Sequence, residues 1–223
     1  LQGKFKAESW HWQKNAYMRA AKWELHEKNY GYALTLALKG KAYPTALRII
    51  SEGGLSVLYK HSPQELRQIL RNATPVERAR NFNACALILL AINLIASQQD
   101  AREERDILMI NLPADWEPSS EENARFLFLE ALDSLPDSGM VEADLRKLLS
   151  FCKENEVKLP RDYFQGIFRG VVGQLGFYYR RSGTLLENVH TLQSIYDICG
   201  LIIKDCDGRL WHSSAEAELN YMQ

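Results

Sequence analysis

Helix-start signals are the feature of this sequence that most narrows what it can fold into. The signals are capping boxes. In a capping box, a Ser or Thr hydroxyl accepts a hydrogen bond from a helical N–H, and a Glu three residues later accepts one from the N–H of the cap residue. Pro63 and Pro75 fall at a first helical position, where a missing N–H costs nothing. Helices are therefore predicted to begin near residues 63, 75, 120 and 185, from the pairs Ser62/Glu65, Thr74/Glu77, Ser119/Glu122 and Thr184/Glu187.

Apolar residues elsewhere recur at the i, i+3, i+4 spacing of amphipathic helices. In the N-terminal part we expect Gly40 to end a helix in the left-handed conformation, Pro44 to open the next helix, and Gly53 with Gly54 to break the chain again. The aromatic residues of the first helix are only loosely spaced, so they do not show which face of that helix is buried. The predicted helices cover Phe5–Glu27, the stretch from Tyr30 to Ile50, Phe126–Leu135, Leu145–Cys152, Pro160 to about Arg181, and Thr184–Lys204.

These segments contain no strand pattern and no tetratricopeptide repeat, so the predicted fold class is all-α. Successive helices joined by short turns pack as antiparallel hairpins, which form a bundle or a short α-solenoid. Residues 111–120 hold two prolines and no apolar stripe, and they are predicted to be a linker. The linker separates an N-terminal helical half, residues 1–110, from a C-terminal helical half, residues 121–206, and residues 207–223 are predicted to form a flexible tail.

The most apolar run, Ala84–Ala96, is 13 residues long. A membrane-spanning helix needs about 20 apolar residues, so we expect a buried central helix. The four cysteines show no CxxC pair, which favours a reduced, intracellular protein with Cys85 as a core residue. We see no signal peptide, and because the chain starts at Leu1 rather than Met we expect a piece of a longer protein.

Four glycines are unusual within a predicted helix, because each costs about 1 kcal/mol relative to Ala. Gly166, Gly170 and Gly173 fall on one side of that helix, with Gly176 close by. A partner helix that approaches closely explains such a set, and it could come from the same chain or from another protein. We therefore take these glycines as candidate interaction residues.

Two groups of arginines are candidate contact residues as well. Arg67, Arg71, Arg78 and Arg80 surround one predicted helix junction, and Arg180 and Arg181 follow Tyr178 and Tyr179. Arginine beside aromatic rings suits both RNA and protein interfaces. Because the net charge is only −1, RNA contact at Arg67, Arg71, Arg78 and Arg80 is expected as a secondary role.

No motif in the sequence assembles a catalytic or metal site. A nucleophile elbow, a phosphate loop and paired histidines are missing, and no cofactor or metal is predicted. Cys199, Cys206 and His212 lack the fourth ligand and the close spacing of a zinc site. Charged neighbours place the pairs Glu103/Glu104 and Glu121/Glu122 on solvated faces.

Three stretches resemble the C-terminal helical domains of WD-repeat subunits of the small-subunit processome, the nucleolar assembly that matures pre-ribosomal RNA. They are "NYGYALTLALKGKAYPTALRII", "ARNFNACALILLAINLI" and "LGFYYRRSGTLLENVHTLQSIYDICGLI". The resemblance implies a nucleolar domain that joins helical domains of sister subunits and has no catalytic role.

Three functions are therefore open. The first is a non-catalytic assembly domain of a ribosome-biogenesis complex, whose partners are other proteins. The second is a helical adaptor outside ribosome biogenesis, in trafficking or as a pathogen effector. The third is an enzyme whose polar site is assembled from distant helices, where sequence spacing carries no information.

Overall fold

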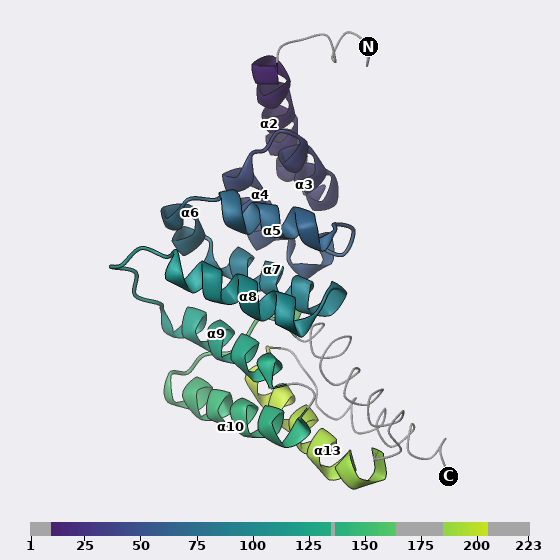
Figure 1. The fold of residues 1–223 in the computed structure, drawn as a ribbon, viewed down its shortest axis with the longest axis vertical. Coiled ribbons are helices and arrows are strands. Elements are labelled where there is room, and N and C mark those ends of the chain that lie inside the picture. Colours follow the sequence, from purple (N-terminus) through teal and green to yellow (C-terminus); the bar gives the residue numbers. More distant parts are fainter. Residues whose placement is uncertain (1–9, 135–136, 164–184, 205–223) are drawn as a thin grey trace. The chain divides into compact units, whose positions relative to one another are not determined.

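The computed structural model describes residues 10–134, 137–163 and 185–204. These residues form an all-α structure (Figure 1), which confirms the predicted fold class. Its only β feature in the described ranges is an isolated bridge between Leu159 and Ile203. The helices are α2 (Trp10–His26), α3 (Tyr30–Lys39), α4 (Tyr43–Gly53), the 3-10 helix η1 (Leu55–Val57), α5 (Pro63–Asn72), α6 (Pro75–Arg80), α7 (Phe82–Ile95), α8 (Gln98–Ile110), α9 (Ser120–Asp133), α10 (Ser138–Glu154) and α13 (Leu185–Ile202).

Three of the four predicted capping boxes are present with both of their hydrogen bonds. Ser62 caps α5, Thr74 caps α6 and Ser119 caps α9, and in each case the hydroxyl accepts from the N–H of the third helical residue at 3.3 Å. Helix α13 begins at Leu185, as predicted, but its proposed cap Thr184 lies outside the described residues. The caps explain why the short helices α5 and α6 start where they do.

The described residues group into two compact units. One unit contains the residues up to Ile95 together with Glu103–Trp116, and the other contains Ala96–Arg102 together with the described residues from Glu117 onward. The boundary between Trp116 of the first unit and Glu117 of the second lies in the non-helical connection between α8 and α9. The first turns of α8 group with the second unit, while the rest of that helix belongs to the first.

Helix α7 forms the centre of the first unit. Eleven of its fourteen residues are buried, and α4, α5, α6 and η1 pack around it. This confirms the prediction of a buried central helix. Its apolar surface on all sides is typical of a core helix. No helix in the described part of the chain is long and apolar enough to cross a membrane.

Helices α2 and α3 form a hairpin whose second helix ends differently from our prediction. Gly40 has φ −82°, so it does not adopt the left-handed conformation, and Lys41 does so instead with φ 49°. The N–H groups of Lys41 and Ala42 donate to the carbonyls of Leu38 and Ala37 in a Schellman motif. Glycine is needed at position 40 because a Cβ there would lie 3.0 Å from Cβ of Tyr17 on α2.

The break after α4 is confirmed, and its two glycines have separate roles. Gly54 has φ 72° and ψ −169°, a conformation open essentially only to glycine. Gly53 allows α4 to approach α3, since a Cβ at this position would lie 2.7 Å from Cβ of Tyr30. Pro44 lies in the first turn of α4, as predicted.

The second unit contains α9, α10 and α13, with α10 packed against both of the others. Phe128 and Tyr163 meet edge to face in its core, with ring centroids 5.3 Å apart. The hydroxyl of Ser194 on α13 donates to Glu142 on α10 at 2.7 Å. Arg102 donates to the carbonyl of Asp133 at 2.7 Å and so satisfies the C-terminal end of α9. The predicted helix from Pro160 is described only as far as Tyr163, and the predicted tail, residues 207–223, lies outside the described residues.

Candidate functional site

The glycine and tyrosine–arginine candidates cannot be placed. Gly166, Gly170, Gly173, Tyr178, Tyr179, Arg180 and Arg181 all lie outside the described residues. Their role in interaction therefore stays a prediction.

The four arginines near the α5–α6 junction are described, and they divide into three environments. Arg71 donates to both carboxylate oxygens of Glu104 on α8, through Nε at 3.1 Å and through Nη2. The Nε atom of Arg67 lies 3.4 Å from Oε1 of the same carboxylate. Arg78 is buried and donates to the carbonyls of Arg71 and Asn111, whereas Arg80 is exposed. Most of this group therefore joins helices within the first unit, and RNA contact stays a prediction.

Glu104 corrects the prediction that the pair Glu103/Glu104 is solvated. Glu103 is exposed, but only 3% of the Glu104 side chain is accessible. A carboxylate can be buried when charged donors satisfy it, and Arg67 and Arg71 do so here. The contact links residues 33 positions apart, so the spacing of neighbouring residues could not reveal it.

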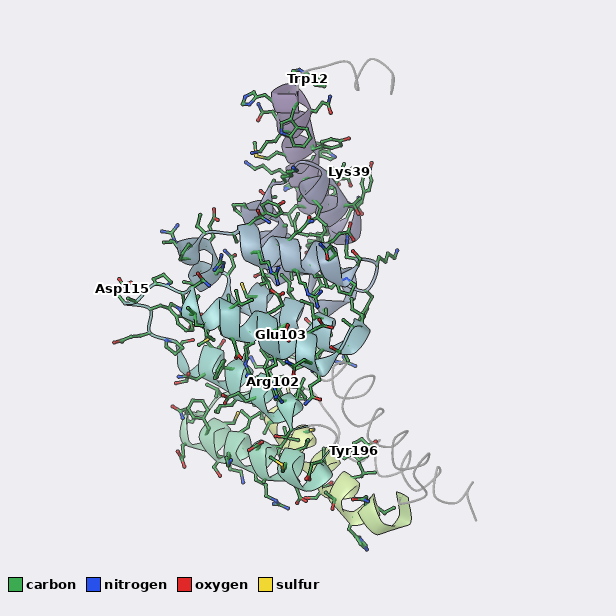
Figure 2. The ribbon with its side chains drawn as sticks, in the orientation of Figure 1. Trp12, Lys39, Arg102, Glu103, Asp115 and Tyr196 are labelled. Carbon is green, nitrogen blue, oxygen red and sulfur yellow. The ribbon has the colours of Figure 1, made fainter. Side chains whose placement is uncertain are left out.

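Helix α2 carries a surface that the sequence analysis missed. Its buried residues in the described structure are Ala21 and Leu25, which lie on the side facing α3 and α4. At about 100° per residue, Trp12 and Trp23 lie about 20° apart on the opposite side of the helix. The accessible fractions of these two residues are 44% and 65%. Figure 2 shows Trp12 near the N-terminal end of α2.

The two tryptophans belong to a regular series of residues. Positions 12, 16, 19, 23 and 26 are separated by alternating steps of four and three, the spacing of a helix–helix seam. We call this series the outer stripe, and it consists of Trp12, Ala16, Arg19, Trp23 and His26. Ala16 is half-buried and small, so the stripe has a low point between the two large rings. A partner side chain could insert there.

The sequence contained the necessary spacing, but not the direction of the core. In the sequence, Trp10, Tyr17, Ala21 and Trp23 have only roughly helical spacing and do not indicate which face is buried. The structure separates them, because Ala21 is buried, Tyr17 lies beside Gly40, and Trp23 points outward. If Ala21 and Leu25 are taken as the buried face of the helix, Trp12 and Trp23 fall on the outer face.

The α2–α3 hairpin is basic, although the whole chain has a net charge of −1. Residues 10–41 contain six Lys or Arg and two Glu, a net charge of +4, and all six cationic side chains are exposed. They are Lys14, Arg19, Lys22, Lys28, Lys39 and Lys41. The ammonium group of Lys41 lies 5.5 Å from the ring centroid of Trp10, and Lys39 closes α3 (Figure 2). The hairpin thus offers apolar rings within a positive field.

The titratable groups with shifted pKa values have structural explanations. Burial raises the pKa of the Cys85 thiol to about 12. Burial also lowers the pKa of His61, and the nearby Glu65 carboxylate opposes that shift. A hydrogen bond from Ser194, with a further contribution from Arg146, lowers the pKa of Glu142. Within the described ranges, no group of three or more His, Cys, Asp or Glu side chains could hold a metal ion.

These features describe a surface suited to association. Large aromatic side chains and arginine are among the residue types enriched at protein interfaces, and Trp12, Arg19 and Trp23 are of these types. Comparisons with protein-family models, with curated proteins and with solved structures found no match for this chain.

Proposed function

We propose that this chain is a non-catalytic helical domain that holds partner proteins in an assembly, and that the assembly is a ribosome-biogenesis complex that processes pre-ribosomal RNA. The observation that carries the proposal is the outer face of α2, where Trp12 and Trp23 are exposed opposite the buried residues Ala21 and Leu25. Exposed tryptophans at seam spacing are difficult to explain by the stability of an isolated chain.

The physical argument rests on the surface that association would remove from water. A tryptophan buries up to about 250 Å², and burial stabilises by about 25 cal/mol per Å² of apolar area. Two rings that are roughly half exposed could therefore contribute a few kcal/mol of binding free energy. This is about what a central group of interface residues contributes. The cost of immobilising them is small, because each ring has only two side-chain torsions.

The setting in ribosome biogenesis is supported by the resemblance of three sequence stretches. The first stretch forms α3 and most of α4, the second forms the end of α6 together with the whole of α7, and the third includes α13. The family's domains are helical, as are the described parts of these stretches. Sister helical subunits of one complex are accordingly the proposed partners.

Purification of the tagged chain from its native cells tests association. We expect sister helical subunits to elute with it in near-stoichiometric amounts, at micromolar concentration and through a moderate salt wash. A chain that elutes as a monomer without partners under these conditions would contradict the proposal.

Localisation tests the cellular setting separately. Nucleolar staining of the full-length protein, together with precursor ribosomal RNA in the purified material, is the expected result. Association with partners at another location would retain the assembly role and favour the adaptor function instead.

A further inference from the structure

The outer stripe of α2 is regular enough to indicate the shape of what covers it. Steps of four and three residues keep five side chains on one line along the helix, and Trp12 and Trp23 are separated by about 16 Å along the axis. A straight line of this length with a low point at Ala16 matches the side chains of another helix, which insert between residues in the same way. Single-stranded RNA imposes no such spacing on its aromatic contacts.

The charges indicate the chemistry of that helix. Arg19 lies within the stripe and Lys22 along one edge, both exposed, while the exposed Glu27 lies along the other edge. The whole hairpin has six cationic side chains against Glu24 and Glu27. In a second copy of α2 paired along the same stripe, the central Arg19 would face its own counterpart, which brings two like charges together and is unfavourable across an interface. Acidic residues beside the apolar stripe of a partner helix would be complementary to Arg19 and Lys22.

Building on the proposed assembly function, we propose that the outer stripe of α2 docks an amphipathic helix of a partner protein, with acidic residues beside its apolar face. Trp12 and Trp23 supply the apolar contact, and Ala16 accepts a large partner side chain between them. Arg19 and Lys22 select acidic partners over basic ones. In this arrangement the partner helix covers the exposed outer face of α2.

A pair of synthetic peptides tests the docking directly on the 223-residue chain. The acidic peptide carries leucine at the two seam positions of each heptad and Glu at the flanking positions, and its twin carries Lys in place of each Glu. Fluorescence anisotropy should show that the acidic peptide binds with a Kd of about 10 µM and that the basic twin binds at least about tenfold more weakly. No saturable binding of the acidic peptide up to about 100 µM would overturn the proposal.

Variants assign the binding to the stripe. Trp12→Ala with Trp23→Ala should weaken binding of the acidic peptide at least about tenfold. Tyr32→Ala is the matched control, because Tyr32 is an exposed aromatic residue of the same hairpin that lies on α3 and outside the stripe. Equal binding by the tryptophan variant and the control would overturn the assignment. Circular dichroism should show that both variants keep the helical content of the wild-type chain.

A charge exchange tests the selection of acidic partners. Arg19→Glu with Lys22→Glu should reverse the preference, so that the basic peptide binds more tightly than the acidic one. An unchanged preference would refute the role given to Arg19 and Lys22.

Three further results separate this inference from its rivals and from the proposed function. Binding of a labelled decauridylate that is lost with Trp12→Ala and Trp23→Ala would overturn the helix in favour of RNA. A dimer in sedimentation equilibrium that these substitutions abolish would overturn it in favour of a second copy. If native partners still purify with the tryptophan variant in full amounts, the docking site is wrong while the assembly function stands.

Discussion

Gly53 and Gly31 show how differently two glycines in neighbouring helices contribute to stability. Gly53→Ala would place a methyl group 2.7 Å from Cβ of Tyr30, and we expect the free energy of unfolding to fall by about 2 kcal/mol. Gly31 has nothing within 4 Å of the position of a Cβ, so Gly31→Ala should raise the free energy of unfolding by about 0.5–1 kcal/mol. Urea unfolding of both variants measures the difference. Equal effects would show that α3 and α4 do not approach as described.

A second prediction at this scale concerns pH. His61 is buried and its pKa is lowered, so the unfolded chain binds a proton at a higher pH than the folded chain does. The associated stability is complete above the unfolded pKa of about 6.5 and is lost as the pH falls through the lower folded pKa. We expect the unfolding free energy of the wild-type chain to decline as the pH falls below about 6.5, towards the lower folded pKa of His61.

The substitution His61→Gln should remove this decline of the unfolding free energy. At lower pH, the unfolding free energy of the variant should then depend on the protonation of carboxylates. Glu65, Glu142 and Asp144 have lowered pKa values, the first through its hydrogen bond from the backbone of Ser62, so their contributions are lost only below the ordinary carboxyl range. Thermal unfolding of both proteins across this pH range is the measurement. Parallel curves for the two proteins would contradict the role of His61.

At the scale of elements, the link between α5 and α8 depends on one buried carboxylate. Glu104→Gln leaves Arg67 and Arg71 without their shared anion, and we expect a loss of about 2 kcal/mol in unfolding free energy, because part of each arginine remains hydrated. Glu103→Gln, on the exposed face of the same helix, should change stability by less than about 0.5 kcal/mol. Chemical denaturation compares the two. A smaller effect at Glu104 than at Glu103 would rule out the described link.

Elements were predictable from the sequence where the determining interaction is local. Capping boxes gave the starts of α5, α6 and α9, because their partners lie three residues apart. The left-handed residue after α3 was misplaced by one position, since contact with Tyr17 rather than backbone conformation requires Gly40. Glu104 was misjudged because its partners belong to another helix.

The candidate surface was the least predictable part, for a related reason. Trp12 and Trp23 have the composition of core residues, and only knowledge of the direction in which Ala21 and Leu25 pack shows that they point outward. The net charge of −1 likewise concealed a hairpin with a charge of +4. A single sequence contains these patterns, but the fold decides which of them face solvent.

At the scale of the whole molecule, three cysteines allow each unit to be followed separately. Cys85 is buried in the first unit, and Cys152 and Cys199 are buried in the second. We expect none of these thiols to react with N-ethylmaleimide in the native protein, because burial prevents access and raises the pKa of Cys85 to about 12.

Pulsed labelling at increasing urea, read by mass spectrometry, then reports the unfolding of each unit. Each unit has its own buried core, so Gly53→Ala should lower the urea concentration at which Cys85 is modified and leave Cys152 and Cys199 unchanged. Modification of all three thiols at one shifted concentration would show that the chain unfolds as a single cooperative body.

Helix α2 packs on one side only, against α3 and α4, with Ala21 and Leu25 as its buried residues, and this has a consequence for finding its partner. Because one face of α2 is open to solvent and few of its residues are buried, we expect its amide protons to exchange with deuterated solvent sooner than those of the buried helix α7. Occupation of its outer face would slow that exchange over residues 10–26 before any other change in the protein became visible. Isotope uptake in this one segment can therefore rank candidate partners whose identities are not known in advance.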